Sequence, residues 1–273
     1  MQPQRTKYDF IFPIGEACCV AHNLKKYKLR LFSNPFDWTG GRAFEELFDC
    51  FLHDFEHFCD QEDIVFYERN PAVNPHYDIY QNKRNKFWFP HDFPIGCDYA
   101  EYYPQVRAKY DKRIARLLEK IKSSQRVLLL HIELPETKKK LITEERLIEL
   151  IAAINEKYPA TRIDILYGRH NAQVPDGEVH YRHINENVLI ADITNTDTRG
   201  EETLDFNSAN IANLLSYIEI GKQPAWTAFC YNARNWLRKT AYKVARNIYC
   251  KKYKNGKEYT RFFGITFRVR TGK

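Results

Sequence analysis

Hydrophobic residues along the first 220 positions fall into two patterns, short continuous runs and stripes with a period of three to four. Arg126–Ile132 is a near-continuous apolar run, which is typical of a parallel strand buried on both faces. A helical stripe capped by Thr143 follows, and Thr161–Tyr167 returns as a strand. This strand–helix–strand spacing predicts a βαβ unit and a parallel sheet.

The same two patterns predict further elements on both sides of this unit. We expect helices at 43–60, 104–121 and 207–220, and strands at 64–67, 77–81, 86–89, 179–184 and 188–193. The sequence therefore predicts an α/β fold with a mostly parallel central sheet flanked by helices.

The stretch from Tyr8 to Trp38 contains the sharpest candidate chemistry. An apolar run reaches Gly15, two cysteines follow, and a helix is expected over 20–27. A strand that breaks at a glycine and restarts as a helix places a side chain at the positive helix N-terminus, where the pKa of a thiol falls. Cys18 is thus a candidate nucleophile; the alternative is that Cys18 and Cys19 are small buried residues.

A thiol nucleophile needs a base, and the base needs an orienting group. His91 is the candidate base, at the end of an aromatic strand and between two prolines. Asp92 is the candidate orienting acid, with Asp98 as an alternative. His22, one helical turn after Cys18, is an alternative base.

Gly15, Glu16, Asp37 and Trp38 are the candidate binding residues around this thiol. Asp37 and Trp38 end the segment Pro35-Phe36-Asp37-Trp38, which we interpret as a packed turn beside the site. N–H groups at the start of the expected helix would form an oxyanion site.

No metal or cofactor is expected. The string His53-Asp54-Phe55-Glu56-His57 matches the H-x-x-E-H zinc pattern, but on a helix both histidines would lie opposite the apolar stripe. The seven cysteines contain no Cys-x-x-Cys, and neither Gly-x-Gly-x-x-Gly nor a Walker sequence occurs.

The net charge of +7 is unevenly distributed. Residues 222–273 carry 14 Lys/Arg and one acid, Glu258, whereas the rest is mildly acidic. We expect two domains, an α/β catalytic domain at 1–221 and a basic amphipathic helix (224–249) with a hairpin around Asn255-Gly256 at 222–273. The helix would bind an anionic membrane surface, bind nucleic acid, or pack on the acidic body; nucleic acid is the least favoured.

The expected location is the cytoplasm, with attachment to the inner membrane face through the basic segment. The first apolar run is short and flanked by Asp9 and Glu16, unlike a signal peptide. No stretch of about 18 uncharged apolar residues is present. Cysteines without a disulfide-framework spacing fit a reducing compartment.

Three segments together resemble a bacterial family, DUF1796, described as papain-like cysteine peptidases. They are Phe12–Cys18, Asn34–Trp38 and Phe89–Asp92, and the similarity spans roughly residues 8–170. The resemblance implies Cys18 as nucleophile with His91 and Asp92 as partners. It also implies a papain-like α+β fold as the alternative architecture, and a setting among surface-polysaccharide genes.

The expected function is thiol-dependent hydrolysis or acyl transfer on a small, peptide or glycan substrate of the cell envelope. One alternative is a glycosyl- or phospho-transferase that offers the same helix N-terminus to a phosphate. The other is a membrane-associated binding module without catalysis.

Overall fold

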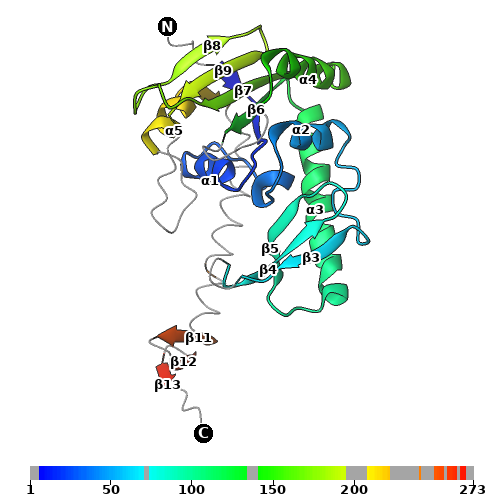
Figure 1. The fold of residues 1–273 in the computed structure, drawn as a ribbon, viewed down its shortest axis with the longest axis vertical. Helices are drawn as coiled ribbons and strands as arrows, with labels where there is room; N and C mark the ends of the chain where they lie inside the picture. The colour runs from blue at the N-terminus through cyan, green and yellow to red at the C-terminus, as the bar shows by residue number, and fades with distance from the viewer. Residues whose placement is uncertain are drawn as a thin grey trace. The chain divides into compact units, whose positions relative to one another are not determined.

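The computed structural model of the chain describes residues 6–70, 74–133, 141–194 and 208–221, and beyond them 240, 249–254, 257–262 and 265–268. The chain divides into two compact units, residues 1–221 and residues 222–273. The centre of the first unit is a five-stranded sheet with the order β2-β6-β7-β9-β8. Its strands are β2 (Phe10–Pro13), β6 (Arg126–Ile132), β7 (Arg162–His170), β8 (His180–His183) and β9 (Val188–Ile193) (Figure 1).

Four of these strands pair in parallel, and β8 adds an antiparallel edge. The β6–β7 pair runs in register from Arg126↔Arg162 to Ile132↔Gly168, with α4 (Glu144–Lys157) as the connection. The predicted βαβ unit is therefore confirmed. A mixed α/β fold with a mostly parallel central sheet is confirmed with it.

Helices cover both faces of this sheet. One face packs on α2 (Phe44–Leu52), α3 (Tyr99–Lys122) and α4, and the other packs on α1 (Cys19–Lys26) and α5 (Ser208–Leu215) (Figure 1). Successive residues of β2 and β6 alternate between the two apolar clusters, because neighbouring side chains of a strand point to opposite faces. Double-sided burial explains why these strands read as continuous apolar runs.

A second sheet follows α2 in the chain. It is antiparallel and consists of β3 (Ile64–Glu68), β4 (Tyr77–Asn82) and β5 (Trp88–Pro94). The predicted strand at 86–89 ends too early, since β5 continues through His91 to Pro94. Its prolines are tolerated because β5 is an edge strand, where a missing N–H breaks no ladder. Helix α3 packs on β5 (Figure 1).

The predicted helix at 43–60 is too long. Helix α2 ends at Leu52, and residues 53–59 form turns with positive φ at Asp54, Phe55 and His57. Phe55 and Phe58 are buried nonetheless, so the turn fills the core positions that the helical spacing assigned to them.

The predicted helix at 207–220 is also too long at its end. Helix α5 stops at Leu215, and β10 (Ile218–Ile220) then pairs in parallel with β1 (Thr6–Tyr8). Ile218 and Tyr217 are buried against the same cluster as α5, so the apolar spacing continued across a change of element.

The second unit contains antiparallel strands β11 (Tyr249–Lys254), β12 (Lys257–Phe262) and β13 (Ile265–Arg268). The β11–β12 pair confirms the predicted hairpin. The basic helix predicted over 224–249 lies outside the described residues, apart from Thr240 and Tyr249, and Tyr249 is the first residue of β11. Within the described part of the chain, no helix is long and apolar enough to cross a membrane.

Replacing Gly15 by alanine tests the close packing of the β2–α1 turn. A Cβ at Gly15 would lie 3.0 Å from the carbonyl oxygen of Ala17 and 3.0 Å from Cγ2 of Val20. We expect Gly15→Ala to lower the free energy of unfolding by about 1–3 kcal/mol, the usual cost of overpacking, in urea denaturation. Gly40→Ala is the control, since its nearest contact would be 3.4 Å. Equal stability of both variants would contradict the packing.

Candidate active site

Cys18 lies at the N-cap of α1, after the turn that follows β2. The carbonyl oxygen of Cys18 accepts the first helical hydrogen bond, from the N–H of His22 at 2.9 Å. Cys18 is half-buried, whereas Cys19 points into the core, where burial raises the pKa of its thiol. Of this vicinal pair, Cys18 is the one whose position suits a nucleophile. The start of α1 presents N–H groups and positive dipole there.

The segment predicted as a packed turn is the 3₁₀ helix η1 (Pro35–Trp38). The Asp37 carboxylate is fully buried and accepts from the backbone N–H of Asn34 at 2.8 Å. The guanidinium of Arg30, only 6% exposed, forms an ion pair with it at 2.6 Å. Burial raises the pKa of Asp37, and Arg30 opposes that shift. The ion pair with Arg30 and the hydrogen bond from Asn34 to Asp37 therefore anchor the η1 turn.

Trp38, at the end of η1, contacts both Arg30, the ion-pair partner of Asp37, and His91. Its ring is 5.8 Å from the imidazole, edge to face, and Arg30 lies 5.6 Å from the same indole. The ring of Tyr77, on β4, also lies edge to face with His91, with ring centroids 6.3 Å apart. The pKa of His91 is lowered, and desolvation of the ring is the largest cause. The negative charge of Asp92 raises the pKa, and the positive charge of Lys109 lowers it.

The two acids predicted as partners of His91 have other contacts. Asp92 points to the buried side of β5, where its carboxylate accepts from Lys109 and, at 2.7 Å, from the hydroxyl of Tyr110. Asp98 is the N-cap of α3 and accepts from the N–H of Glu101 at 3.1 Å. Asp92 thus fixes β5 on α3 and acts on His91 through its charge. Its role as an orienting group stays a prediction.

The chain between η1 and α2 links the Cys18 turn to β5. Gly40 exchanges two backbone hydrogen bonds with Trp88, at 3.2 and 2.9 Å. A Cβ on Gly40 would lie 3.4 Å from the carbonyl oxygen of Glu16, so the two segments are close there. Helix α1 and strand β5 both pack against η1 as well. The structure thereby places the elements that carry Cys18 and His91 around one small turn.

A cavity of about 640 Å³ opens at the carboxyl ends of the parallel strands. Glu16 after β2, Glu133 after β6 and Tyr167 within β7 contribute to its lining, as do the first residues of α2 and of α4. Sequence reasoning missed Glu133 and Tyr167. The available signal was position alone, because ligands of parallel α/β sheets bind at the carboxyl ends of the strands.

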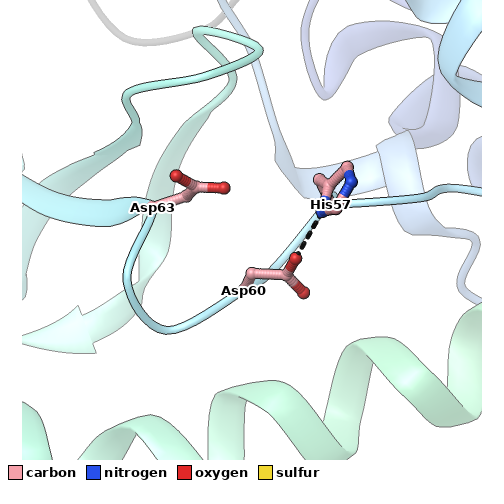
Figure 2. Close-up of side chains that lie close together, drawn as sticks. All are labelled: His57, Asp60 and Asp63. Atoms are coloured by element: carbon pink, nitrogen blue, oxygen red, sulfur yellow. Dashed lines mark hydrogen bonds and ion pairs between the residues drawn. The ribbon is translucent and has the colours of Figure 1, made fainter.

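The H-x-x-E-H histidines do not share a helical face. The ring of His53 contacts the carbonyl oxygen of Asp49, and that of His57 contacts Asp60 at 2.7 Å. One ligand atom each from His57, Asp60 and Asp63 lies within 4.8 Å of the others (Figure 2). Arg107 already pairs with Asp60 at 2.8 Å and Arg84 with Asp63 at 3.0 Å. A cation at this cluster would compete with two guanidinium groups.

Comparison with known proteins identifies the family to which the chain belongs. A family profile, DUF1796, described as "Putative papain-like cysteine peptidase", matches residues 9–171, and the chain belongs to this family. The matched region includes the Cys18 turn, η1, β5 and the βαβ unit. An uncharacterized protein of Acanthamoeba polyphaga mimivirus is 22% identical over 156 residues, which are 52% of this chain and 69% of that protein. No solved structure matches the chain.

Removing Arg30 should destabilise the protein strongly. Arg30→Met leaves the Asp37 carboxylate buried without its ion-pair partner, so we expect the free energy of unfolding to fall by about 3–5 kcal/mol. Urea denaturation measures the loss. The matched control is Arg146→Met, whose partners Glu45 and Glu149 are exposed and which should cost at most about 1 kcal/mol. A small loss for Arg30→Met would contradict the anchoring role of Asp37.

The titration of His91 is the second test of this arrangement. Its imidazole pKa, followed by NMR, should lie below the ordinary value of 6.5. Lys109→Met should raise that pKa, because a positive charge near the ring disfavours its protonated form. Lys112→Met, on an exposed position of the same helix, should leave it unchanged. A His91 pKa at or above 6.5, or no response to Lys109→Met, would contradict the described environment.

Proposed function

We propose that this protein is a cysteine-dependent hydrolase that cleaves an amide bond through a Cys18 thiolate. The observation that carries the proposal is the placement of Cys18. It is a half-buried thiol at the N-cap of α1, beside the carboxyl end of a parallel strand, in a chain of the DUF1796 family. A helix N-terminus is one of the environments that lower the pKa of a thiol.

In the proposed reaction, neutral His91 takes the proton of the Cys18 thiol, Cys18 Sγ attacks the carbonyl carbon, and an S–C bond forms. N–H groups at the start of α1 hold the negative oxygen of the tetrahedral intermediate. The C–N bond then breaks, and the protonated His91 gives its proton to the leaving amine. Water, deprotonated by His91, hydrolyses the thioester and restores the thiol. The cycle starts from a neutral His91, and the lowered pKa of His91 favours that form.

A hydrolase fits the turn better than a phosphate-binding transferase does. The loop before α1 carries Glu16, a carboxylate that is 7% exposed, next to the helix N-terminus. A phosphate bound there would lie near that negative charge, in partly desolvated surroundings where like charges repel strongly. An amide substrate is uncharged when it binds, so its binding meets no such repulsion.

The proposal includes a location. The lysines and arginines of residues 222–273, among them Lys251, Lys252 and Lys254 of β11, suit an anionic membrane surface. An enzyme held there would reach substrates of the cell envelope, which is the substrate setting we favour.

Alkylation rates test the nucleophile without knowledge of the substrate. At pH 6.5, iodoacetamide should label Cys18 about tenfold faster than Cys97, since only the thiolate reacts and burial raises the pKa of Cys97. Peptide mass spectrometry measures both rates in one sample.

Two histidine variants identify the base. His91→Ala should slow labelling of Cys18, whereas His22→Ala, which removes an exposed histidine of α1, should not. If His22→Ala alone slows it, the base is assigned wrongly. If Cys18 reacts no faster than Cys97 in the unaltered protein, the nucleophile is wrong.

A further inference from the structure

Exposed apolar side chains gather on the three-stranded antiparallel sheet. On β3, Val65, Phe66 and Tyr67 are 40%, 54% and 50% exposed, and they follow one another in the chain. Trp88 of β5 is 36% exposed on the same sheet. Among the described residues, Leu141 is the other large apolar side chain that is exposed, and it lines the cavity at the strand ends. A contiguous exposed apolar patch marks an interaction surface.

The backbone of β3 forms one edge of this sheet. The strand order is β3-β4-β5, and within the described part of the chain β3 pairs with β4 alone. Edge strands of monomeric proteins are commonly protected by lysine, by proline or by a covering segment. The segment Val65–Tyr67 contains neither lysine nor proline. Its outward N–H and C=O groups are therefore suited to pair with a further strand.

The exposed side chains of β3 lie on both faces of the sheet. Phe66 contacts Tyr80, with ring centroids 5.8 Å apart, and Tyr80 stacks on Tyr99 of α3. Tyr67 stacks instead on Trp88, on the face away from α3, with ring centroids 5.5 Å apart. A ligand lying on one face would leave the other face exposed, whereas a strand added at the edge covers both. The occupant that fits this edge is therefore a β-strand.

Charges at the two ends of β3 are complementary when the strand meets a reversed copy of itself. Glu62 is exposed just before the strand, and Glu68 and Arg69 are exposed at its other end. Arg84, also exposed, pairs with Asp63 at the first end. An antiparallel copy would bring the partner's Arg69 towards Glu62 and the partner's Glu68 towards Arg84. A parallel copy would set Glu68 against Glu68, and like charges directly opposite are destabilising.

We infer that two copies of this chain associate through β3, antiparallel and about a twofold axis, so that their three-stranded sheets become one continuous sheet. The register that places the exposed apolar residues opposite one another is centred on Phe66. Phe66 then faces the partner's Phe66, and Val65 faces the partner's Tyr67. Pairs between aromatic side chains, and between aromatic and β-branched ones, stabilise neighbouring antiparallel strands. A twofold contact of this kind closes on itself, as in most homodimers.

The contact is short and should be reversible. Strand β3 has five residues, and its register with β4 shifts between Phe66 and Glu68, so the pairing ends at Tyr67. We therefore expect a dissociation constant of about 10 μM, in the range of transient interfaces. His91 lies on β5, the opposite edge strand, so dimerisation does not cover that edge. The inference does not depend on the proposed function.

Sedimentation velocity of the full chain tests the association. The sedimentation coefficient should rise from that of a monomer at about 1 μM to that of a dimer at about 100 μM. Phe66→Lys and Tyr67→Lys should each weaken the dimer at least about tenfold, because each places a charge in the pairing edge. Leu141→Lys is the matched control, since it adds the same charge at an exposed apolar residue outside the sheet and should leave the dimer unchanged.

Cysteine substitutions test the register. Directly opposite residues have Cβ atoms about 5 Å apart, close to the disulfide requirement, whereas diagonal neighbours are about 7–8 Å apart. With copper–phenanthroline as oxidant, Phe66→Cys should therefore cross-link to its own copy. Val65→Cys, which faces the partner's Tyr67, should cross-link at least about tenfold more slowly. Mass spectrometry of the unreduced peptides identifies the linked residues.

Circular dichroism verifies that each variant is folded, and two independent lysine variants guard against the failure of one. A chain that stays monomeric at about 100 μM would overturn the inference and leave the edge to a different partner. A dimer that survives both Phe66→Lys and Tyr67→Lys would also overturn it. Equal cross-linking of Val65→Cys and Phe66→Cys would contradict the twofold register.

Discussion

The buried ion pair between Arg30 and Asp37 is the interaction on which the candidate site depends. A carboxylate with no exposed surface is tolerated only when it is paired and hydrogen-bonded, and Asp37 has both Arg30 and the N–H of Asn34. These contacts fix η1, and η1 contacts α1, α3 and β5. A short turn with one buried charge thereby determines how three separate elements meet.

The consequences reach both residues of the proposed reaction. Trp38 is the last residue of η1 and packs edge to face on His91, so the position of the turn sets the surroundings of the imidazole. On the other side, Gly40 approaches the backbone of Glu16, two residues before Cys18. Asp92 stabilises the same arrangement from beneath, through Lys109 and Tyr110 of α3. The candidate site is thus held by charges that the proposed reaction does not use.

Much of this was accessible from the sequence, for physical reasons that differ between residues. Continuous apolar runs revealed the parallel strands, since burial on both faces removes the alternation of a half-exposed sheet. The packed turn at Pro35–Trp38 and the N-cap position of Cys18 followed from local residue types. The end of α2 did not, because Phe55 and Phe58 reach the core from turns at the spacing of a helix.

Long-range contacts were the other part that could not be predicted. Nothing local indicates that Asp92 pairs with Lys109 and Tyr110, or that Glu133 lies near Glu16, because these contacts join residues distant in the chain.

The central claim remains that Cys18 is the nucleophile. Its most direct test is the site of acylation when the protein reacts with an activated ester. A hydroxylamine-labile thioester mapped by mass spectrometry to Cys18 is the predicted result, and acylation only at other residues would contradict it.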